Sequence, residues 1–229
     1  MKKEKRPSAA PAAKKVLIVD DHPMTRQGLI TLIGSEPDLI VCGEAETAHQ
    51  ALEAVQQLHQ DLVLADISLP GRNGLELVKD LRSLHPELPV LVISMHDEML
   101  YAERVLRAGG RGYIMKQEGG RRIMEAIRQI LSGRVFVSER MSAQILDNLS
   151  GRSPQGQHSP VEKLTDREFE VFELIGHGLA TREIALQLHL SAKTVEVHRL
   201  HIKQKLKLKT ATELIRYAVR WVESEKSGE

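Results

Sequence analysis

The 229-residue sequence has a single cysteine, Cys42, and therefore no second thiol for an internal disulfide. This excludes a disulfide framework and favours a reducing compartment, with Cys42 buried in a strand. Long apolar runs are also missing, since none approaches the roughly 20 residues that a membrane-spanning helix needs. No apolar segment of signal-peptide type follows the basic residues at the N-terminus. We therefore expect a cytoplasmic protein without membrane contact.

The sequence also has almost no excess of charge, with 32 Lys and Arg residues against 31 Asp and Glu residues and a formal net charge of +1. This balance alone does not indicate a nucleic-acid-binding protein, so the positions of the charges matter more than their sum. Hydrophobic residues make up 41% and charged residues 28%, an ordinary composition for a protein that buries a core. The length favours two modest domains over one.

From Lys15 to about Gly133, short apolar runs alternate with amphipathic segments, and glycines and prolines mark the changes. The runs are nearly continuous and mostly aliphatic, as expected for strands buried on both faces of a parallel sheet. Alternation on this scale predicts an α/β fold with a doubly wound sheet and right-handed crossovers. The five predicted strands are 16–19, 39–41, 62–65, 90–93 and 113–115.

The remainder of the chain has a different pattern. A polar segment with Gly, Ser and Pro at 150–160 has nothing to bury and is interpreted as a linker. After Leu164 the pattern is only helical, and the predicted capping residues of its helices are Thr165, Thr181, Ser191 and Thr210. The predicted organisation is a disordered basic tail at 1–14, an α/β domain at 15–134, a connecting helix and linker at 135–160, and a small all-α domain at 161–225.

Polar side chains stand where the predicted strands end, at the sheet edge where open α/β folds bind ligands. Clustered carboxylates repel one another unless a cation lies among them, and Mg²⁺ suits such a place because it prefers oxygen ligands and phosphate oxygens. A carboxylate can also act as the nucleophile in phosphoryl transfer, while lysine and serine stabilise phosphoryl oxygens. The residues in these positions are Asp20, Asp21, Asp66, Ser94 and Lys116.

The segments that carry these residues closely resemble the receiver domains of two-component response regulators. The resemblance runs from 16 to about 132 and rests on VLIVDDH, VLADISLPGRNG, Ser94 and GYIMK. It implies a flavodoxin-like fold in which Asp66 accepts the phosphoryl group. It also implies a Mg²⁺ site whose ligands are Asp20, Asp21, Asp66 and the backbone carbonyl of Ser68.

The same resemblance assigns a switch and a phosphoryl contact. Ser94 and Tyr113 would form the hydroxyl–aromatic switch, and Lys116 would contact the phosphoryl group. One position departs from the family pattern, because Gln117 follows Lys116 where many receivers have proline in a cis peptide bond. A cis bond before a non-proline residue costs about 2.5–4 kcal/mol. The loop geometry and the lifetime of the phosphoryl group are therefore left open.

The predicted helix after Ser191 has a basic outer face. Between 193 and 209 it carries six basic residues and a single acid, Glu196, which is the kind of local excess that contacts phosphates. Val197 lies among these charges and could meet a thymine methyl group, whereas His198 lies on the apolar stripe and is expected to be packed. Glu196 could accept a hydrogen bond from cytosine or repel phosphate, and both alternatives stay open.

The all-α segment resembles the LuxR-type helix-turn-helix domain of response regulators of the NarL/FixJ class. The resemblance implies that 191–207 forms the recognition helix and that the last helix is a dimerisation element. The candidate DNA-binding residues are Thr181, Lys193, Thr194, Glu196, Val197, Arg199, Leu200, Lys203 and Lys207.

Together the resemblances imply a DNA-binding transcriptional regulator that accepts a phosphoryl group from a sensor histidine kinase on Asp66. It would bind double-stranded DNA as a homodimer when active, and would be a regulator whose only catalysis is its own phosphotransfer and dephosphorylation. An aspartate-nucleophile phosphatase is a second class, which Ser68 disfavours because such enzymes usually have an acid there. A constitutive DNA-binding protein with a silent receiver is a third, and phosphate-independent DNA binding would distinguish it.

Overall fold

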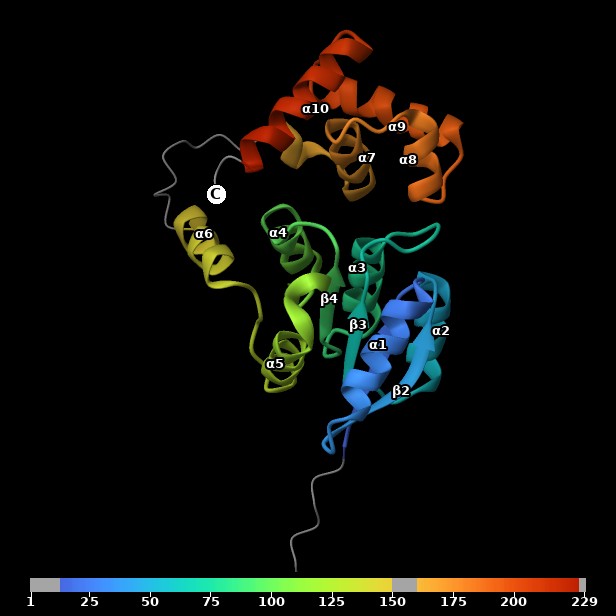
Figure 1. Ribbon diagram of the computed structural model, residues 1–229, viewed down its shortest axis with the longest axis vertical. Helices are drawn as coiled ribbons and strands as arrows, with labels where there is room; N and C mark the ends of the chain where they lie inside the picture. Colours follow the sequence, from blue (N-terminus) through green and yellow to red (C-terminus); the bar gives the residue numbers. More distant parts are fainter. Residues whose placement is uncertain (1–12, 150–159, 227–229) are drawn as a thin grey trace, which may run out of the picture.

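The computed structural model describes residues 13–149 and 160–226. Figure 1 shows an α/β domain, drawn in blue to green, and a helical domain in orange and red above it. The predicted tail at 1–14 lies almost wholly outside the described residues, although Lys14 already belongs to the first strand. Most of the predicted linker also lies outside them. The short 3₁₀ turn Pro160–Lys163 leads into the helical domain.

The α/β domain is built on a five-stranded sheet whose observed pairings are all parallel. All five predicted strands are present, and the fold class is confirmed. The strand order is β2-β1-β3-β4-β5, so the chain reverses its direction of winding between β1 and β3. The strands are β1 (Lys14–Val19), β2 (Leu39–Ala45), β3 (Leu62–Ala65), β4 (Val90–Ser94) and β5 (Gly112–Met115).

Helices cover both faces of this sheet because neighbouring strand residues point to opposite sides. In β1, Val16 and Ile18 pack with α1 and α5, whereas Leu17 and Val19 pack with α2, α3 and α4. Each side is thus a separate apolar core, as the nearly continuous apolar runs predicted. The helices are α1 (Pro23–Gly34), α2 (Ala48–Gln57), α3 (Gly74–Leu84), α4 (Glu98–Ala108) and α5 (Gly119–Leu131).

The start of α3 is placed tightly against the end of β3. Asn73 caps α3 by accepting a hydrogen bond from the amide of Glu76. A Cβ atom at Gly74 would lie 2.0 Å from the backbone oxygen of Asp66, so only glycine allows this approach. The capping residue Asn73 and the adjacent Gly74 therefore fix the end of the loop that follows Asp66.

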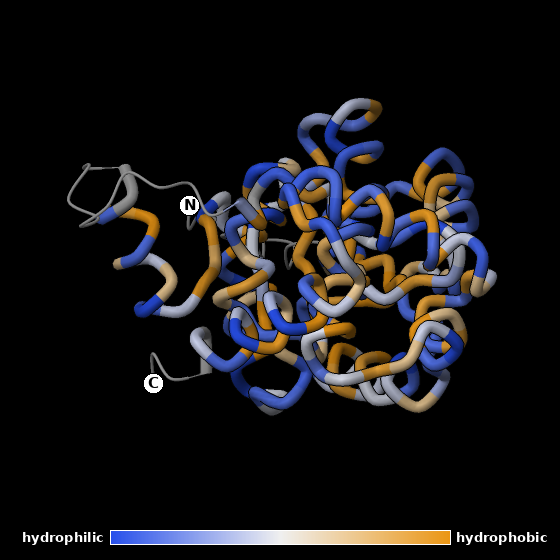
Figure 2. Tube along the Cα trace, turned by 90° about the horizontal axis from the view of Figure 1, so that it is seen from above, coloured by the Kyte–Doolittle hydropathy of each residue, from blue (hydrophilic) through white to orange (hydrophobic). Residues whose placement is uncertain are grey.

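A connecting helix, α6 (Glu139–Leu149), follows the α/β domain and lies at the edge of the molecule (Figures 1 and 2). It is tied to α4, because the carboxylate of Glu98 accepts a hydrogen bond from the Ser138 amide and Met141 is fully buried. Across the described ranges, no helix is both long enough and apolar enough to cross a membrane.

The all-α domain packs four helices around the aromatic residues of its first helix. Phe169 and Phe172 both contact Trp221, with ring centroids 5.5 Å apart in each pair. The caps at Thr165 and Ser191 are present. The cap at Thr181 was wrong, because Ala180 occupies the cap position and Thr181 is the first helical residue. The helices are α7 (Asp166–Gly176), α8 (Thr181–Gln187), α9 (Ala192–Lys205) and α10 (Ala211–Lys226).

Candidate functional site

The carboxyl ends of β1 and β3 lie side by side at the point where the winding reverses. Asp20 follows β1 and Asp66 follows β3, and both side chains are buried, with 0% and 2% of the residue exposed. Burying two carboxylates so close together requires a compensating positive charge. The strand order therefore creates the site that the sequence pattern predicted at this edge.

Lys116, which follows β5, supplies that positive charge. Its Nζ lies 2.7 Å from an oxygen of Asp20 and 2.8 Å from an oxygen of Asp66. Burial by itself would lower the pKa of Lys116, but the two carboxylates outweigh it and raise the pKa. Lys116 is therefore charged at neutral pH and bridges the two acids.

Four side chains at this edge could hold a metal ion. Each of Asp20, Asp21, His22 and Asp66 offers one ligand atom, and these atoms all lie within 4.8 Å of one another. The Oδ1 atom of Asp66 is buried and accepts no hydrogen bond, so it is available to a further group. Three carboxylates in a polar cleft fit the oxygen-rich coordination of Mg²⁺. The sequence patterns did not point to His22, whose Nδ1 lies 2.7 Å from Asp21 Oδ1.

Ser94 and Tyr113 are both completely buried and both contact the backbone of His96. The Tyr113 hydroxyl donates to the His96 carbonyl at 2.8 Å, and the His96 amide donates to Ser94 Oγ at 3.3 Å. Burial raises the pKa of Tyr113 well above its ordinary value, so its hydroxyl stays a donor. The two predicted switch residues are therefore joined through one short loop.

Ser68 lies across from this loop, and its hydroxyl is 3.1 Å from His96 Nε2. No sequence pattern singled out His96, because a histidine two residues after a strand carries no local signal of such a contact. The peptide bond between Lys116 and Gln117 is trans, and Gln117 lies in a short 3₁₀ turn that leads into α5. The metal role predicted for the Ser68 carbonyl stays a prediction.

A cleft of about 770 Å³ opens beside these residues. Asp66 and Lys116 line its α/β side, whereas Leu186, Gln187 and His189 line it from the all-α domain. The cleft is large enough for a small phosphorylated molecule. Both domains therefore contribute to the surroundings of the carboxylate site.

In the all-α domain, α9 buries one stripe and exposes another. Val195 and Ile202 are completely buried, while Val197 and Leu200 are 44% and 48% exposed. Exposed apolar side chains on a helix can contact thymine methyl groups in the major groove, so the exposure of Val197 and Leu200 is compatible with the predicted base contacts. Of the other predicted DNA contacts, Lys193, Glu196 and Lys207 are exposed, and Thr181, Thr194, Arg199 and Lys203 are partly exposed.

The predicted contacts at the start of α8 and along α9 are connected. The Thr181 hydroxyl donates to Glu196 at 2.7 Å and accepts from Arg199 at 3.2 Å. Glu196 therefore holds Thr181 and Arg199 in place, a role that the sequence did not indicate. Lys207 lies beyond the end of α9, which stops at Lys205, two residues before the predicted end of the recognition helix.

Comparison with known proteins agrees with this architecture. Residues 16–128 match the family model described as response regulator receiver domain, and residues 162–218 match bacterial regulatory proteins of the luxR family. The nitrate/nitrite response regulator NarL of Escherichia coli is 35% identical over 213 residues, covering 92% of this chain and 95% of NarL. The chain belongs to the response regulator family. Its receiver and LuxR-type domains place it in the NarL/FixJ class, as the sequence predicted.

Two further relatives of this response regulator are similar over nearly their full length. The oxygen regulatory protein NreC of Staphylococcus carnosus is 32% identical over 210 residues, covering 90% of this chain and 97% of NreC. A structure of the RcsB response regulator of Salmonella typhimurium has a TM-score of 0.56 at 25% identity, covering 90% of this chain and 98% of RcsB. This response regulator is thus a two-domain DNA-binding regulator of transcription.

Proposed function

We propose that a sensor histidine kinase transfers a phosphoryl group to Asp66 and thereby controls how this response regulator binds double-stranded DNA. The observation that carries the proposal is the environment of Asp66. Its Oδ1 is buried without a hydrogen-bond partner, while Oδ2 is held 2.8 Å from Lys116 at the wall of the cleft. One oxygen is therefore free to act as nucleophile, and the other is already paired with a cation.

The chain's own residues account for the transfer step. Asp66 Oδ1 would attack the phosphorus atom of the donor as the bond to the donor's imidazole nitrogen breaks. Lys116, already within reach of Asp66, would pair with a phosphoryl oxygen as a mobile point charge. A bound Mg²⁺ would supply positive charge that stabilises the phosphoryl oxygens, and Asp20, Asp21, Asp66 and the Ser68 carbonyl would hold it.

The switch would begin at Ser94. Its hydroxyl would donate to a phosphoryl oxygen, which changes its contact with the His96 amide. Because the Tyr113 hydroxyl holds the carbonyl of the same residue, a shift at Ser94 is passed to Tyr113 through this loop. The receiver would also hydrolyse its own phosphoryl group, so the protein acts as a regulator that resets itself.

The all-α domain, which we call the output domain, supports the DNA-binding part of the proposal. Solved RcsB structures at 25% identity and a TM-score of 0.55 include two RcsB dimers bound to two parallel DNAs. By analogy, two copies of α9 would occupy half-sites about 34–36 Å apart in a homodimer. In α10, the element assigned to dimerisation, Ile215 is 42% exposed and available to a second copy.

The proposal is tested by incubating the full chain with Mg²⁺ and phosphoramidate and measuring its intact mass. We expect a single phosphoryl adduct that Asp66→Asn abolishes. Asp61→Asn is the matched control, because Asp61 is a partly exposed carboxylate on the same domain that pairs with Lys14. An unlabelled wild-type chain, under conditions that label another receiver, would contradict the proposal and leave a DNA-binding protein with a silent receiver.

A further inference from the structure

One face of α7 in the output domain is acidic yet packs against the receiver. Asp166, Glu170 and Glu173 lie four and three residues apart and so share a side of the helix. Glu170 and Glu173 are only 1% and 5% exposed. Figure 1 shows α7 directly above the ends of α3 and α4. Buried carboxylates are stable only where donors or cations meet them. Arg167 on the same helix pairs with Glu170 at 2.6 Å, and the receiver supplies further partners.

The receiver meets each of these acids with a matching group. The amide of Asn73 donates to Glu170 at 3.3 Å, and Lys79 pairs with Asp166 at 2.6 Å. Arg104 also pairs with Asp166 and lies 4.0 Å above the ring of Phe169. The contact between the two domains is therefore specific and polar.

Glu173 has the contacts that matter most for the phosphoacceptor. Its Oε2 accepts a hydrogen bond from the fully buried Tyr101 hydroxyl at 2.7 Å and lies 3.4 Å from His96 Nδ1. Burial by itself would raise the pKa of Glu173, but His96 and Tyr101 outweigh it and lower the pKa. Glu173 is therefore a buried, ionised group whose charge is stabilised by the receiver.

His96 connects Glu173 to the site at Asp66. Its ring lies between Glu173 and the Ser68 hydroxyl, while its backbone holds Ser94 and Tyr113. A movement of the switch residues must therefore disturb the histidine that Glu173 holds. The docked α7 and the unphosphorylated positions of Ser94 and Tyr113 support each other.

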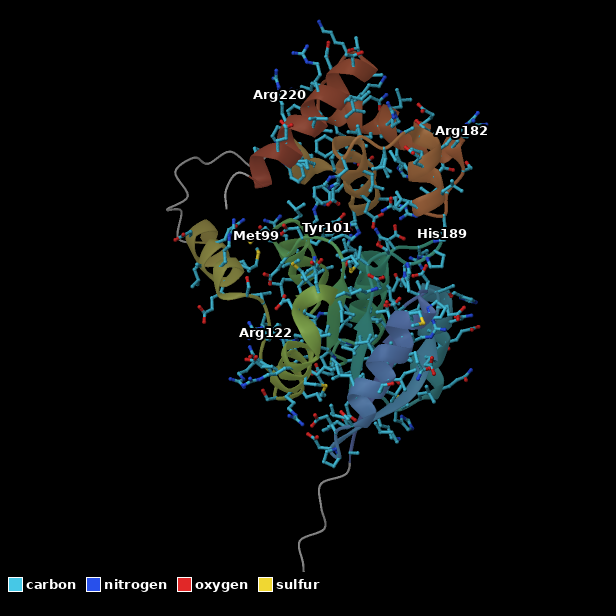
Figure 3. All side chains as sticks on the ribbon, viewed as in Figure 1. Met99, Tyr101, Arg122, Arg182, His189 and Arg220 are labelled. Carbon is cyan, nitrogen blue, oxygen red and sulfur yellow. The ribbon has the colours of Figure 1, made fainter. Side chains whose placement is uncertain are left out.

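A second contact lies on the opposite side of the cleft. His189, in the turn between α8 and α9, has Nε2 3.6 Å from Asp21 Oδ2. Figure 3 shows Tyr101 and His189 well apart from each other along the junction of the two domains. The output domain thus reaches the phosphoacceptor edge at two separate places.

The DNA-reading side chains have a different relation to the receiver. Val197 and Leu200 on α9 are about half exposed, and Lys193 is exposed as well. The residues of the output domain that line the cleft come from α7, the end of α8, its following turn and α10. Docking therefore covers the phosphoacceptor and leaves these side chains of α9 open.

We propose that Glu173 of the output domain is a positioning residue for phosphoryl transfer, which holds the receiver through Tyr101 and His96 in the form that is slow to accept a phosphoryl group on Asp66. This inference rests on the proposed function. By thermodynamic linkage, phosphorylation of Asp66 and release of Glu173 favour each other to the same extent. Weakening the contact should therefore speed phosphorylation without altering the DNA-reading surface.

The test uses the full chain with Mg²⁺ and phosphoramidate, and measures the rate of adduct formation in Glu173→Gln and Tyr101→Phe. Tyr101→Phe removes the donor of the hydrogen bond to Glu173, and Glu173→Gln removes the negative charge that strengthens this bond and pairs with His96. We therefore expect about a tenfold faster rate in each variant. Because both variants weaken the same hydrogen bond, the double variant should gain less than the product of the two effects. The matched control is Glu53→Gln, an exposed acid on α2 that should leave the rate unchanged.

Two further readouts separate positioning from a general loss of structure. Far-UV circular dichroism should match the wild type, and the affinity for random-sequence duplex DNA should be unchanged. Rates equal to or below that of the wild type in both single variants would overturn the inference and leave the proposed function standing. A rate in the double variant that equals the product of the two single effects would overturn the inference as well. The absence of an adduct in every chain would instead overturn the proposed function, and the inference with it.

Discussion

Replacing Lys116 by methionine should destabilise the receiver, because it leaves two buried carboxylates without their cation. The Lys116 side chain is 8% exposed, and those of Asp20 and Asp66 are 0% and 3% exposed. Methionine keeps a long apolar side chain, so the change removes mainly the charge. Removing one partner of a buried ion pair costs about 3–5 kcal/mol. We expect the lower end, about 3 kcal/mol, because Asp66 lines a cleft that water can enter.

The loss is measured by hydrogen exchange in increasing urea, read on peptides from β1 and β3, which report the unfolding of the receiver itself. Lys14→Met is the matched control, since Lys14 Nζ lies 2.6 Å from Asp61 in a pair that is 54% and 32% exposed. An exposed pair of this kind contributes at most about 1 kcal/mol. The two lysines therefore make contacts of similar length with very different expected costs.

Mg²⁺ should restore most of the stability lost in Lys116→Met, because it can neutralise the same carboxylates. A ligand at a hundredfold excess over its Kd stabilises the folded state by about 2.7 kcal/mol, close to the expected loss. A variant as stable as the wild type without Mg²⁺ would refute the reasoning. Stabilisation of Lys116→Met by Mg²⁺ that persists when Asp21→Asn is added would refute the assignment of the effect to this site, because Asp21 is one of its proposed ligands.

Three other predictions concern the output domain. Thr165→Ala removes a capping box and should cost about 1 kcal/mol, visible as an earlier urea midpoint of tryptophan fluorescence; an unchanged midpoint would contradict it. Burial would raise the pKa of Glu168, but Lys205 and Thr165 outweigh it and lower the pKa. The contacts of ionised Glu168 therefore stabilise the folded state fully above about pH 4.3, the pKa of a glutamate in the unfolded chain. This stabilisation is lost as the pH falls through the lower pKa of Glu168 in the folded state. In Lys205→Met the free energy of unfolding should therefore fall less steeply as the pH is lowered. An unchanged dependence on pH would contradict the stabilising role of the Lys205–Glu168 ion pair. Lys193→Ala should weaken binding to DNA of any sequence and reduce the slope of log affinity against log salt concentration by about 1. An unaltered slope would show that Lys193 does not contact a phosphate.

The central strands β3 and β4 were predictable because they are buried at every position, which demands an almost continuous run of apolar residues. The run 62–65 became β3 with the same bounds, and Ser94 and Tyr113 fell in β4 and β5. The cap at Thr181 failed for a local reason. Glu183 accepts the amide of Ala180, so the backbone was satisfied without the threonine hydroxyl, which instead contacts Glu196 and Arg199.

The cluster of Asp20, Asp66 and Lys116 could be anticipated because parallel strands end at a common edge, whatever their order. The bridging position of Lys116, 2.7 and 2.8 Å from the two acids, required the strand order that the fold adopts. His96 was missed because nothing in its neighbouring residues distinguishes it from a histidine on a surface loop. His22 was given no role, although it directly follows Asp20 and Asp21.

The sequence by itself determined the two folds and the residues Asp20, Asp66 and Lys116 at the carboxyl edge of the sheet, because both depend on local patterns of burial and on strand ends. Only the tertiary structure decided how the domains meet. Glu173 and Tyr101 are 72 positions apart, and Asn73 and Glu170 are 97 apart. A glutamate on an amphipathic helix is usually solvated, so its local sequence does not reveal a buried partner on another domain. That partnership depends on the docked surfaces as a whole, and it joins the output domain to the site where we propose that phosphoryl transfer occurs.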